Sequence, residues 1–180
     1  RDTMREDRAF EEKDFYQMYQ DEMDCIIPCT EDEMEELSEE LLSGNERAKK
    51  RLIEGCLAMA AELSEEYRDR GLPAGDLVQE ANMALLLLVS EYEGGNFRAQ
   101  AEERIREALE TALDIQDTEQ KIEEEMLARV NVLKDISAQM AEELGREATV
   151  EELAARMKMT VEEIKDIMKL TLDAMSVSGE

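Results

Sequence analysis

The sequence predicts an all-α fold, in which a larger helical bundle is followed by a three-helix domain, and three observations favour this class. Hydrophobic residues make up 43% of the chain and recur at helical spacing, whereas aromatic residues make up only 4%. The composition favours Glu, Ala, Leu and Met, which are good helix formers, over the β-branched and aromatic residues of strands. Capping boxes also open three of the expected helices, at Thr30, Thr149 and Thr160.

The larger bundle is expected over residues 14–113, after a polar and loosely helical lead-in at 1–13. Apolar spacing predicts a short helix that Pro28 ends, then four further helices separated by Gly- and Asn-containing breaks, with Asp76 as the cap of the third of these. The central part of that capped helix is apolar on all sides, which predicts burial among other helices. The four longer helices are expected over about 31–42, 46–67, 76–92 and 97–113, around a core of Leu57, Leu63, Leu85, Val89 and Ile105.

The three-helix domain is expected over residues 126–180, after a polar linker at 114–125. A clean apolar stripe runs from Met126 to Met140 and ends before Gly145. Two capped helices follow, separated by a tight turn, and this order is typical of a helix-turn-helix motif. Because any three-helix bundle can show the same order, the pattern alone does not identify a DNA-binding domain.

The charge balance narrows the classes of function. Asp and Glu number 47 against 21 Lys and Arg, so the net charge of −26 should repel nucleic acid and anionic membranes unless the basic residues share one face. The chain contains no His, which excludes the usual His-dependent catalytic and metal sites, and we expect no enzyme, no cofactor and no metal. Cys25, Cys29 and Cys56 are expected to be reduced thiols of a cytoplasmic protein. The longest apolar run, at 83–89, is too short to cross a membrane.

Several segments, taken in order, resemble the sigma-70 family of bacterial RNA polymerase sigma factors. Residues 51–54, 67–72 and 76–82 are similar to the family's second conserved region, and residues 145–154 resemble its third. Residues 15–30 are similar to the short segment that precedes the core-binding domain. Each stretch is weak alone, and the resemblance depends on their common order and ungapped spacing. It implies the two helical domains of the family over most of the chain.

The resemblance implies a binding surface for core RNA polymerase. In the family, a helix with the motif Asp-Leu-Ile-Gln-Glu-Gly-Asn docks on a coiled coil of the largest polymerase subunit. Independently of this resemblance, Asp76, Gln79 and Glu80 lie within about one helical turn of each other. Their carboxylates and amide can therefore pair with Arg on a partner helix. The alternative is a capping aspartate followed by a solvated face. The positions implied to bind polymerase are Asp76, Leu77, Gln79, Glu80, Asn82 and Leu86.

The next helix of the family recognises the minus-ten promoter element, and here its DNA-facing positions are replaced. The family's Tyr position is Gln100, and its two Trp positions are Glu103 and Arg104. The positions of its base-contacting Gln and Thr are Glu107 and Glu110. Further on, the family's His and Glu that contact the extended promoter element correspond to Glu125 and Ala128. The inward positions stay apolar, so the helix should still pack.

These replacements predict weak or absent promoter binding by the chain alone. Stacking of a base on an aromatic ring and a good bidentate base contact are each worth about 1–3 kcal/mol. From Phe97 to Glu125, ten acidic and four basic residues give a net charge of 4 − 10 = −6, which adds repulsion from phosphates. The basic residues that can still meet phosphates are Arg98, Arg104 and Arg106.

Three functions stay open from the sequence. The first is a degenerate sigma paralogue that binds core polymerase and regulates transcription, by competing with a true sigma factor or by working with an anti-sigma factor or another second protein. The second is a divergent sigma factor that directs initiation at unusual promoters. The third is a helical adaptor for a small protein ligand, which the 12 Met residues would suit.

The end of the sequence falls where the family would begin its acidic finger, at residues 176–179. The family's C-terminal helix-turn-helix domain, which recognises the minus-thirty-five element, has no counterpart here. A natural truncation and a fragment of a longer product are both compatible with this sequence.

Overall fold

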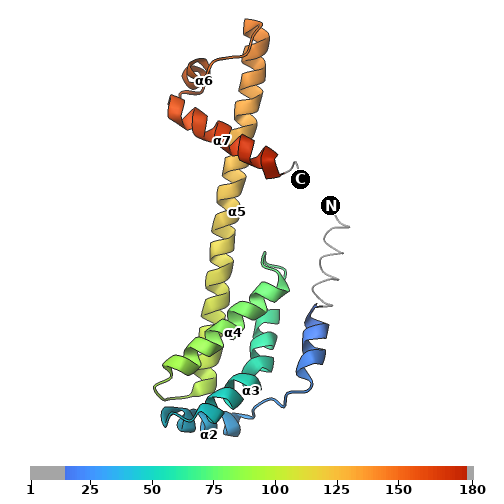
Figure 1. Ribbon diagram of the computed structural model, residues 1–180, viewed down its shortest axis with the longest axis vertical. Coiled ribbons are helices and arrows are strands. Elements are labelled where there is room, and N and C mark those ends of the chain that lie inside the picture. Colours follow the sequence, from blue (N-terminus) through green and yellow to red (C-terminus); the bar gives the residue numbers. More distant parts are fainter. Residues whose placement is uncertain (1–14, 178–180) are drawn as a thin grey trace. The chain divides into compact units, whose positions relative to one another are not determined.

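The computed structural model describes residues 15–177, which form helices joined by turns and contain no strand (Figure 1). The predicted all-α class is confirmed. The chain divides into two compact units, Arg1–Asp117 and Thr118–Glu180. The lead-in expected at 1–13 lies outside the described residues. The helices are a segment at 15–23, α2 (Glu31–Leu42), α3 (Glu46–Glu65), α4 (Ala74–Glu91), α5 (Phe97–Leu144), α6 (Val150–Met157) and α7 (Val161–Val177).

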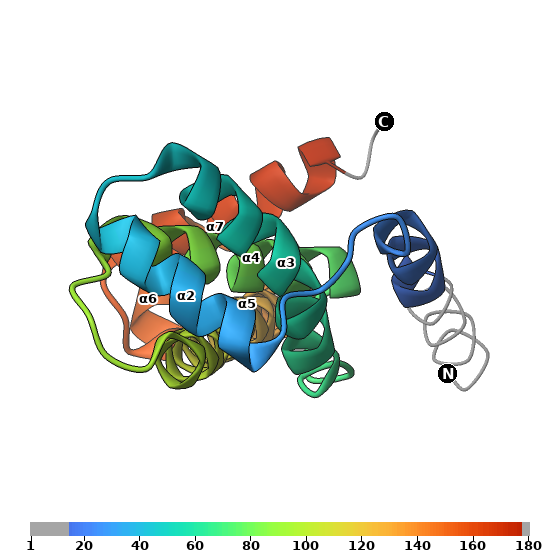
Figure 2. The same cartoon turned by 90° about the horizontal axis from the view of Figure 1, so that it is seen from below.

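The core of the first unit is built by α2, α3, α4 and the first part of α5. One cluster joins Met34 of α2, Cys56 of α3, Leu85 of α4 and Phe97 of α5, and a second continues along α3, α4 and α5. Figures 1 and 2 place the 15–23 segment beside α3, joined to α2 by the stretch at 24–30. Tyr16 of this segment packs on α4 in a small cluster of its own. The segment is therefore part of the folded unit.

Four of the five predicted core residues are buried, and one is not. Leu63, Leu85, Val89 and Ile105 lie in the core, as expected. Leu57 is only half-buried, because the inward positions on its part of α3 are those of Leu52, Cys56 and Ala60, which recur every fourth residue. The predicted burial of Leu57 was therefore wrong, because the inward position is that of Cys56, one residue earlier.

The helix starts follow local capping chemistry. The Thr30 hydroxyl accepts a hydrogen bond from the Glu33 amide at 3.1 Å, and the Asn45 side chain accepts from Arg47 and Ala48. Asp76 is not the cap of α4, contrary to the prediction. The helix begins two residues earlier, after Pro73, and Asp76 lies in its first turn, where a carboxylate complements the helix dipole.

Residues 114–125 are helical, and the predicted helix end at Leu113 was wrong. The segment lacks Gly and Pro and consists mainly of good helix formers, so α5 continues through it to Leu144. Its exposed face carries polar pairs at helical spacing, such as Gln120 with Glu124 at 3.4 Å. A polar stretch between two apolar stripes therefore need not be a loop. The boundary between the two units falls inside it.

The second unit packs the end of α5 with α6 and α7. Leu133, Met140, Leu153, Ile164 and Ile167 form its core. The predicted capping box at Thr149 is present, with both reciprocal hydrogen bonds to Glu152. At the end of α6, Lys158 adopts a left-handed conformation with φ of 54°, which makes the tight turn into α7.

The close approach of Gly55 to the loop before α2 leads to a stability prediction. A Cβ atom on Gly55 would overlap Sγ of Cys29 and lie 3.1 Å from the Cys29 backbone nitrogen, which donates to the Gly55 carbonyl at 2.9 Å. We expect Gly55→Ala to lower the free energy of unfolding by about 1–3 kcal/mol, as overpacking does elsewhere. Urea denaturation followed by circular dichroism measures this change.

The matched control is Gly75→Ala in α4. A Cβ atom there would lie 3.7 Å from the Phe15 ring, an ordinary contact, so the change should be neutral or stabilise by up to about 1 kcal/mol. Equal effects of the two substitutions would contradict the packing argument.

Candidate functional site

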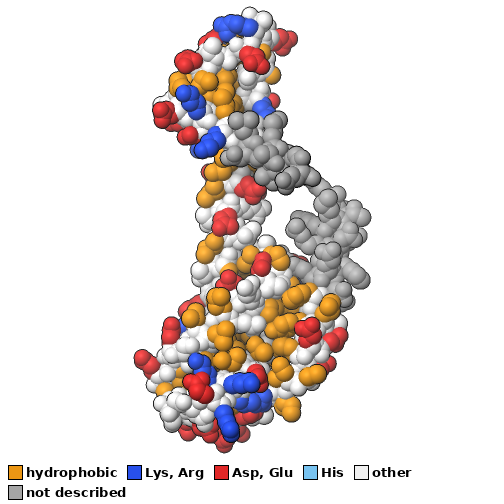
Figure 3. Space-filling view, viewed as in Figure 1, with side chains coloured by type: hydrophobic (Ala, Val, Ile, Leu, Met, Phe, Trp, Pro, Cys, Tyr) orange, Lys and Arg blue, Asp and Glu red, His pale blue; other side chains and the backbone are white. Residues whose placement is uncertain are grey.

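One face of α4 is exposed along the length of the helix. Asp76, Gln79 and Glu80 are exposed on its first turns. Met83, Leu86 and Leu87 continue the same face and are 52%, 47% and 51% exposed. Their spacing of three and four residues places all six side chains on one side of the helix. We call these six residues the α4 face; hydrophobic side chains gather over this part of the first unit in Figure 3.

Four of the six residues that were predicted to bind polymerase lie on the α4 face, namely Asp76, Gln79, Glu80 and Leu86. Leu77 is fully buried in the core instead. Asn82 is half-buried, and its Nδ2 donates to the Tyr19 hydroxyl at 3.2 Å. Leu77 therefore packs α4 into the core, and Asn82 joins α4 to the 15–23 segment.

Sequence reasoning missed Met83 and Leu87. The apolar stretch at 83–89 was expected to be buried on all sides, and this was wrong, because no described helix covers its outer side. The helical period was the available signal, since Met83, Leu86 and Leu87 continue the spacing of Asp76, Gln79 and Glu80.

A shallow groove of about 260 Å³ lies beside the start of the α4 face. It is lined by Asp76, Gln79 and Glu80 together with Leu72 and with Ile115 and Gln116 of α5. Within residues 15–177, neither Asp76 nor Glu80 takes part in an ion pair. The two carboxylates therefore face solvent next to an apolar wall, where a cationic side chain of a partner can approach them.

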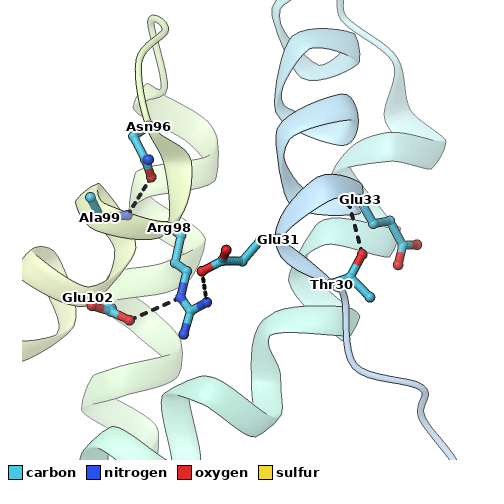
Figure 4. Close-up of polar contacts among 7 residues, drawn as sticks. All are labelled: Thr30, Glu31, Glu33, Asn96, Arg98, Ala99 and Glu102. Atoms are coloured by element: carbon cyan, nitrogen blue, oxygen red, sulfur yellow. Dashed lines mark hydrogen bonds and ion pairs between the residues drawn. The ribbon is translucent and has the colours of Figure 1, made fainter.

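Three arginines in the first part of α5, which belongs to the first unit, are engaged by glutamates. Arg98 pairs with Glu31 of α2 and, at 3.2 Å, with Glu102 (Figure 4). Arg104 pairs with Glu91 at the end of α4 at 2.5 Å, and Arg106 pairs with Glu66 after α3 at 2.7 Å. Each guanidinium thus lies beside a carboxylate of the same unit.

The contacts of Arg98 and Arg106 favour the charged form of these two side chains. The hydrogen bond with Glu102, followed by the charge of Glu31, raises the pKa of Arg98 above its ordinary value. The hydrogen bond with Glu66 does the same to the pKa of Arg106. Arginine is cationic at neutral pH in any case, so the consequence is electrostatic. A phosphate that approaches either arginine meets a neutralised pair and not a free cation.

The other replaced positions of α5 carry either side chains with partners inside the first unit or exposed side chains. Gln100 donates from Nε2 to the Gly94 carbonyl at 2.8 Å and so stabilises the preceding turn. The Glu110 carboxylate accepts a hydrogen bond from the Tyr67 hydroxyl at 3.4 Å. Glu103 and Glu107 are exposed carboxylates, and Glu125 and Ala128 are exposed in the second unit. After Phe97, α5 contains no aromatic residue on which a base could stack.

The glutamates that engage the arginines could not be identified from the sequence. Glu31, Glu66 and Glu91 lie on or just after three other helices, and Glu31 is separated from Arg98 by 67 residues. Only the packing of α2, α3 and α4 around α5 brings them together.

The cysteines and the metal-ligating side chains of the described residues form no metal cluster. Residues 15–177 contain no group of three His, Cys, Asp or Glu side chains that could hold a metal ion. Cys25, Cys29 and Cys56 are free thiols, and burial raises the pKa of Cys56 to about 12. Among the same residues, every helix is too short or too polar to cross a membrane.

Comparisons with known proteins give a consistent result. A family model described as Sigma-70 region 3 matches residues 128–180. Two curated relatives, both named RNA polymerase sigma factor SigA, come from Bacillus sp and Clostridium acetobutylicum and are 34% and 31% identical over 163 residues. Each match covers 89% of this chain but 43% of the relative. The chain therefore spans less than half the length of these relatives.

The ion pairs on α5 lead to a prediction about nucleic-acid affinity. We expect the triple variant Glu31→Gln, Glu66→Gln and Glu91→Gln to bind a fluorescent single-stranded oligonucleotide about tenfold more tightly at low ionic strength, because Arg104 and Arg106 lose their partners and Arg98 loses one of its two. Fluorescence anisotropy measures the affinity.

The matched control removes three carboxylates from α2. Glu35, Glu36 and Glu39 are exposed and take part in no ion pair within the described residues. Their triple Gln variant changes the net charge equally, so it should raise the affinity far less. An equal rise in both variants would mean that net charge alone governs binding.

Proposed function

Since the chain belongs to the sigma-70 family of RNA polymerase sigma factors, we propose that it binds core RNA polymerase through the α4 face and regulates transcription without recognising promoters by itself. One contrast supports this proposal. The carboxylates of the α4 face take part in no ion pair within the described residues, whereas Arg98, Arg104 and Arg106 in the first part of α5 are each paired with a glutamate. The surface suited to protein remains available, and the surface suited to DNA is neutralised.

The α4 face combines the two kinds of contact that a protein interface needs. Asp76, Gln79 and Glu80 can form charge-assisted hydrogen bonds with arginines of a partner helix. Met83, Leu86 and Leu87 add apolar area, and full burial of such a side chain contributes about 1.5–3 kcal/mol relative to full exposure. Because these three are already half-buried, each adds about half as much. The resemblance to the family suggests the coiled coil of the largest polymerase subunit as the partner.

The surroundings of Arg98, Arg104 and Arg106 on α5 argue against promoter recognition by the chain alone. An exposed ion pair is worth about 0.2–1 kcal/mol, so displacing three glutamates costs at most a few kcal/mol. The larger loss is that of stacking platforms and base contacts, each worth about 1–3 kcal/mol in proteins that have them. We infer that the chain competes with other sigma factors for polymerase or acts with a second regulatory protein.

Capture of core RNA polymerase tests the proposed surface. We expect the immobilised chain to retain polymerase, and the double variant Gln79→Ala and Glu80→Lys to retain at least about tenfold less, because charge-assisted hydrogen bonds worth about 1.5–3 kcal/mol are replaced by repulsion. Glu39→Lys, which reverses an exposed charge on α2, is the matched control. Undiminished capture by the double variant would refute the surface.

A second candidate is a divergent sigma factor that directs initiation. The outward positions of Arg98, Arg104 and Arg106 favour it, as do the names of the two relatives. On this view, polymerase would hold a promoter strand close enough for phosphates to displace the glutamates.

Anisotropy with a labelled nontemplate promoter strand separates the two candidates. If the chain is a regulator, its complex with polymerase should show no preference between the promoter strand and a scrambled strand. Salt-dependent binding that favours the promoter strand would support the divergent sigma factor instead.

A further inference from the structure

A second groove in the first unit lies between the 15–23 segment and α3. Its volume is about 350 Å³, and Ala58 and Ala61 of α3 form its floor. The walls include Tyr16, Met23 and Pro28. Tyr16 is buried, and its hydroxyl lies 3.5 Å from the Ser64 hydroxyl, so one wall is anchored to α3. We call this cavity the α3 groove; none of its lining residues belongs to the α4 face.

Carboxylates surround the apolar floor of the α3 groove. Asp24, Glu62 and Glu65 line it, and among the described residues no Lys or Arg does. Glu65 is paired with Arg68 at 3.7 Å, whereas Asp24 and Glu62 take part in no ion pair within residues 15–177. Beside the groove, Ile27 is 77% exposed. The α3 groove thus joins an apolar depression to a negatively charged margin.

We propose that the α3 groove docks a short basic segment of a partner protein, which places an aliphatic side chain over Ala58 and Ala61 and directs Lys or Arg toward Asp24 and Glu62. Charge complementarity selects this partner. A neutral apolar segment would desolvate the carboxylates without compensation, and an acidic segment would be repelled. A second copy of this chain is disfavoured by the net charge of −26 on each molecule.

The proposal does not depend on polymerase binding, because the α3 groove and the α4 face share no residue. It adds a second contact surface to the first unit. One molecule could therefore meet two proteins at once, one through each surface.

A methionine NMR experiment on the full chain tests the proposal. The probe is a short synthetic peptide that alternates leucine with lysine and arginine, and the protein carries 13C in its methionine methyl groups. Met23 lines the α3 groove and Met83 lies on the α4 face, so the two signals report the two surfaces separately. We expect the Met23 signal to shift on titration and the Met83 signal to stay. A shift of Met83 alone would overturn the assignment.

Peptide and protein variants define the chemistry of binding. Replacing the leucines of the peptide with serine, or its basic residues with glutamine, should each abolish the Met23 shift. Glu62→Lys and the groove-filling Ala58→Leu should each weaken binding about tenfold, whereas Glu39→Lys should weaken it less than about twofold. Equal weakening of peptide binding by Glu62→Lys and Glu39→Lys would mean that net charge alone governs binding, and it would refute the proposal.

Other occupants of the α3 groove give distinct results. If residues 1–14 of this chain occupy it, their deletion should shift the Met23 signal without peptide and tighten peptide binding. If a second copy occupies it, the Met23 signal should change with protein concentration. Either result would overturn the proposal of a basic partner.

Discussion

The packing of the first part of α5 against α3 and α4 is the interaction on which the surfaces of the first unit depend. Phe97, Ala101, Ile105, Leu109 and Leu113 are buried at every fourth position and fix the rotation of α5 about its axis. Because that rotation is fixed, the outward positions are fixed as well. Arg98 is then held beside α2, Arg104 beside the end of α4 and Arg106 beside the end of α3. The core thus decides which charges meet.

The same packing gives α4 and α5 an inward side, which builds the core, and an outward side, which meets solvent or a partner. A helix has an inward and an outward side that can change independently, since side chains on opposite sides do not touch. On the first part of α5 the inward side is apolar, while the outward side carries glutamates and three arginines that are paired with glutamates. On α4 the inward residues Leu77 and Leu85 are fully buried, and the outward side stays available to a partner. One bundle can therefore keep a protein-binding surface and lose a nucleic-acid surface.

The all-α class and most helix positions could be predicted from the sequence, because apolar period and capping residues are local signals. The capping box at Thr149 is an example. The continuation of α5 through 114–125 was missed, because a polar segment without Gly or Pro resembles a linker although its residues favour helix. Glu102 lies four residues after Arg98 on the same helix, but Glu31, Glu66 and Glu91, the partners on or after other helices, had no local signal. They depend on helix packing, which brings together residues far apart in the sequence.

The arginine–glutamate pairs have a consequence for how the chain would respond to salt. A free arginine that binds a phosphate displaces mobile ions from the nucleic acid, and this release makes binding strongly dependent on salt concentration. For an arginine that is already paired with a glutamate, the counterion is the glutamate carboxylate, which is covalently part of the chain. A phosphate that displaces it leaves that carboxylate nearby and uncompensated. Around Arg98, Arg104 and Arg106 the surface is therefore already neutralised, and its counterions are glutamate side chains that cannot diffuse away.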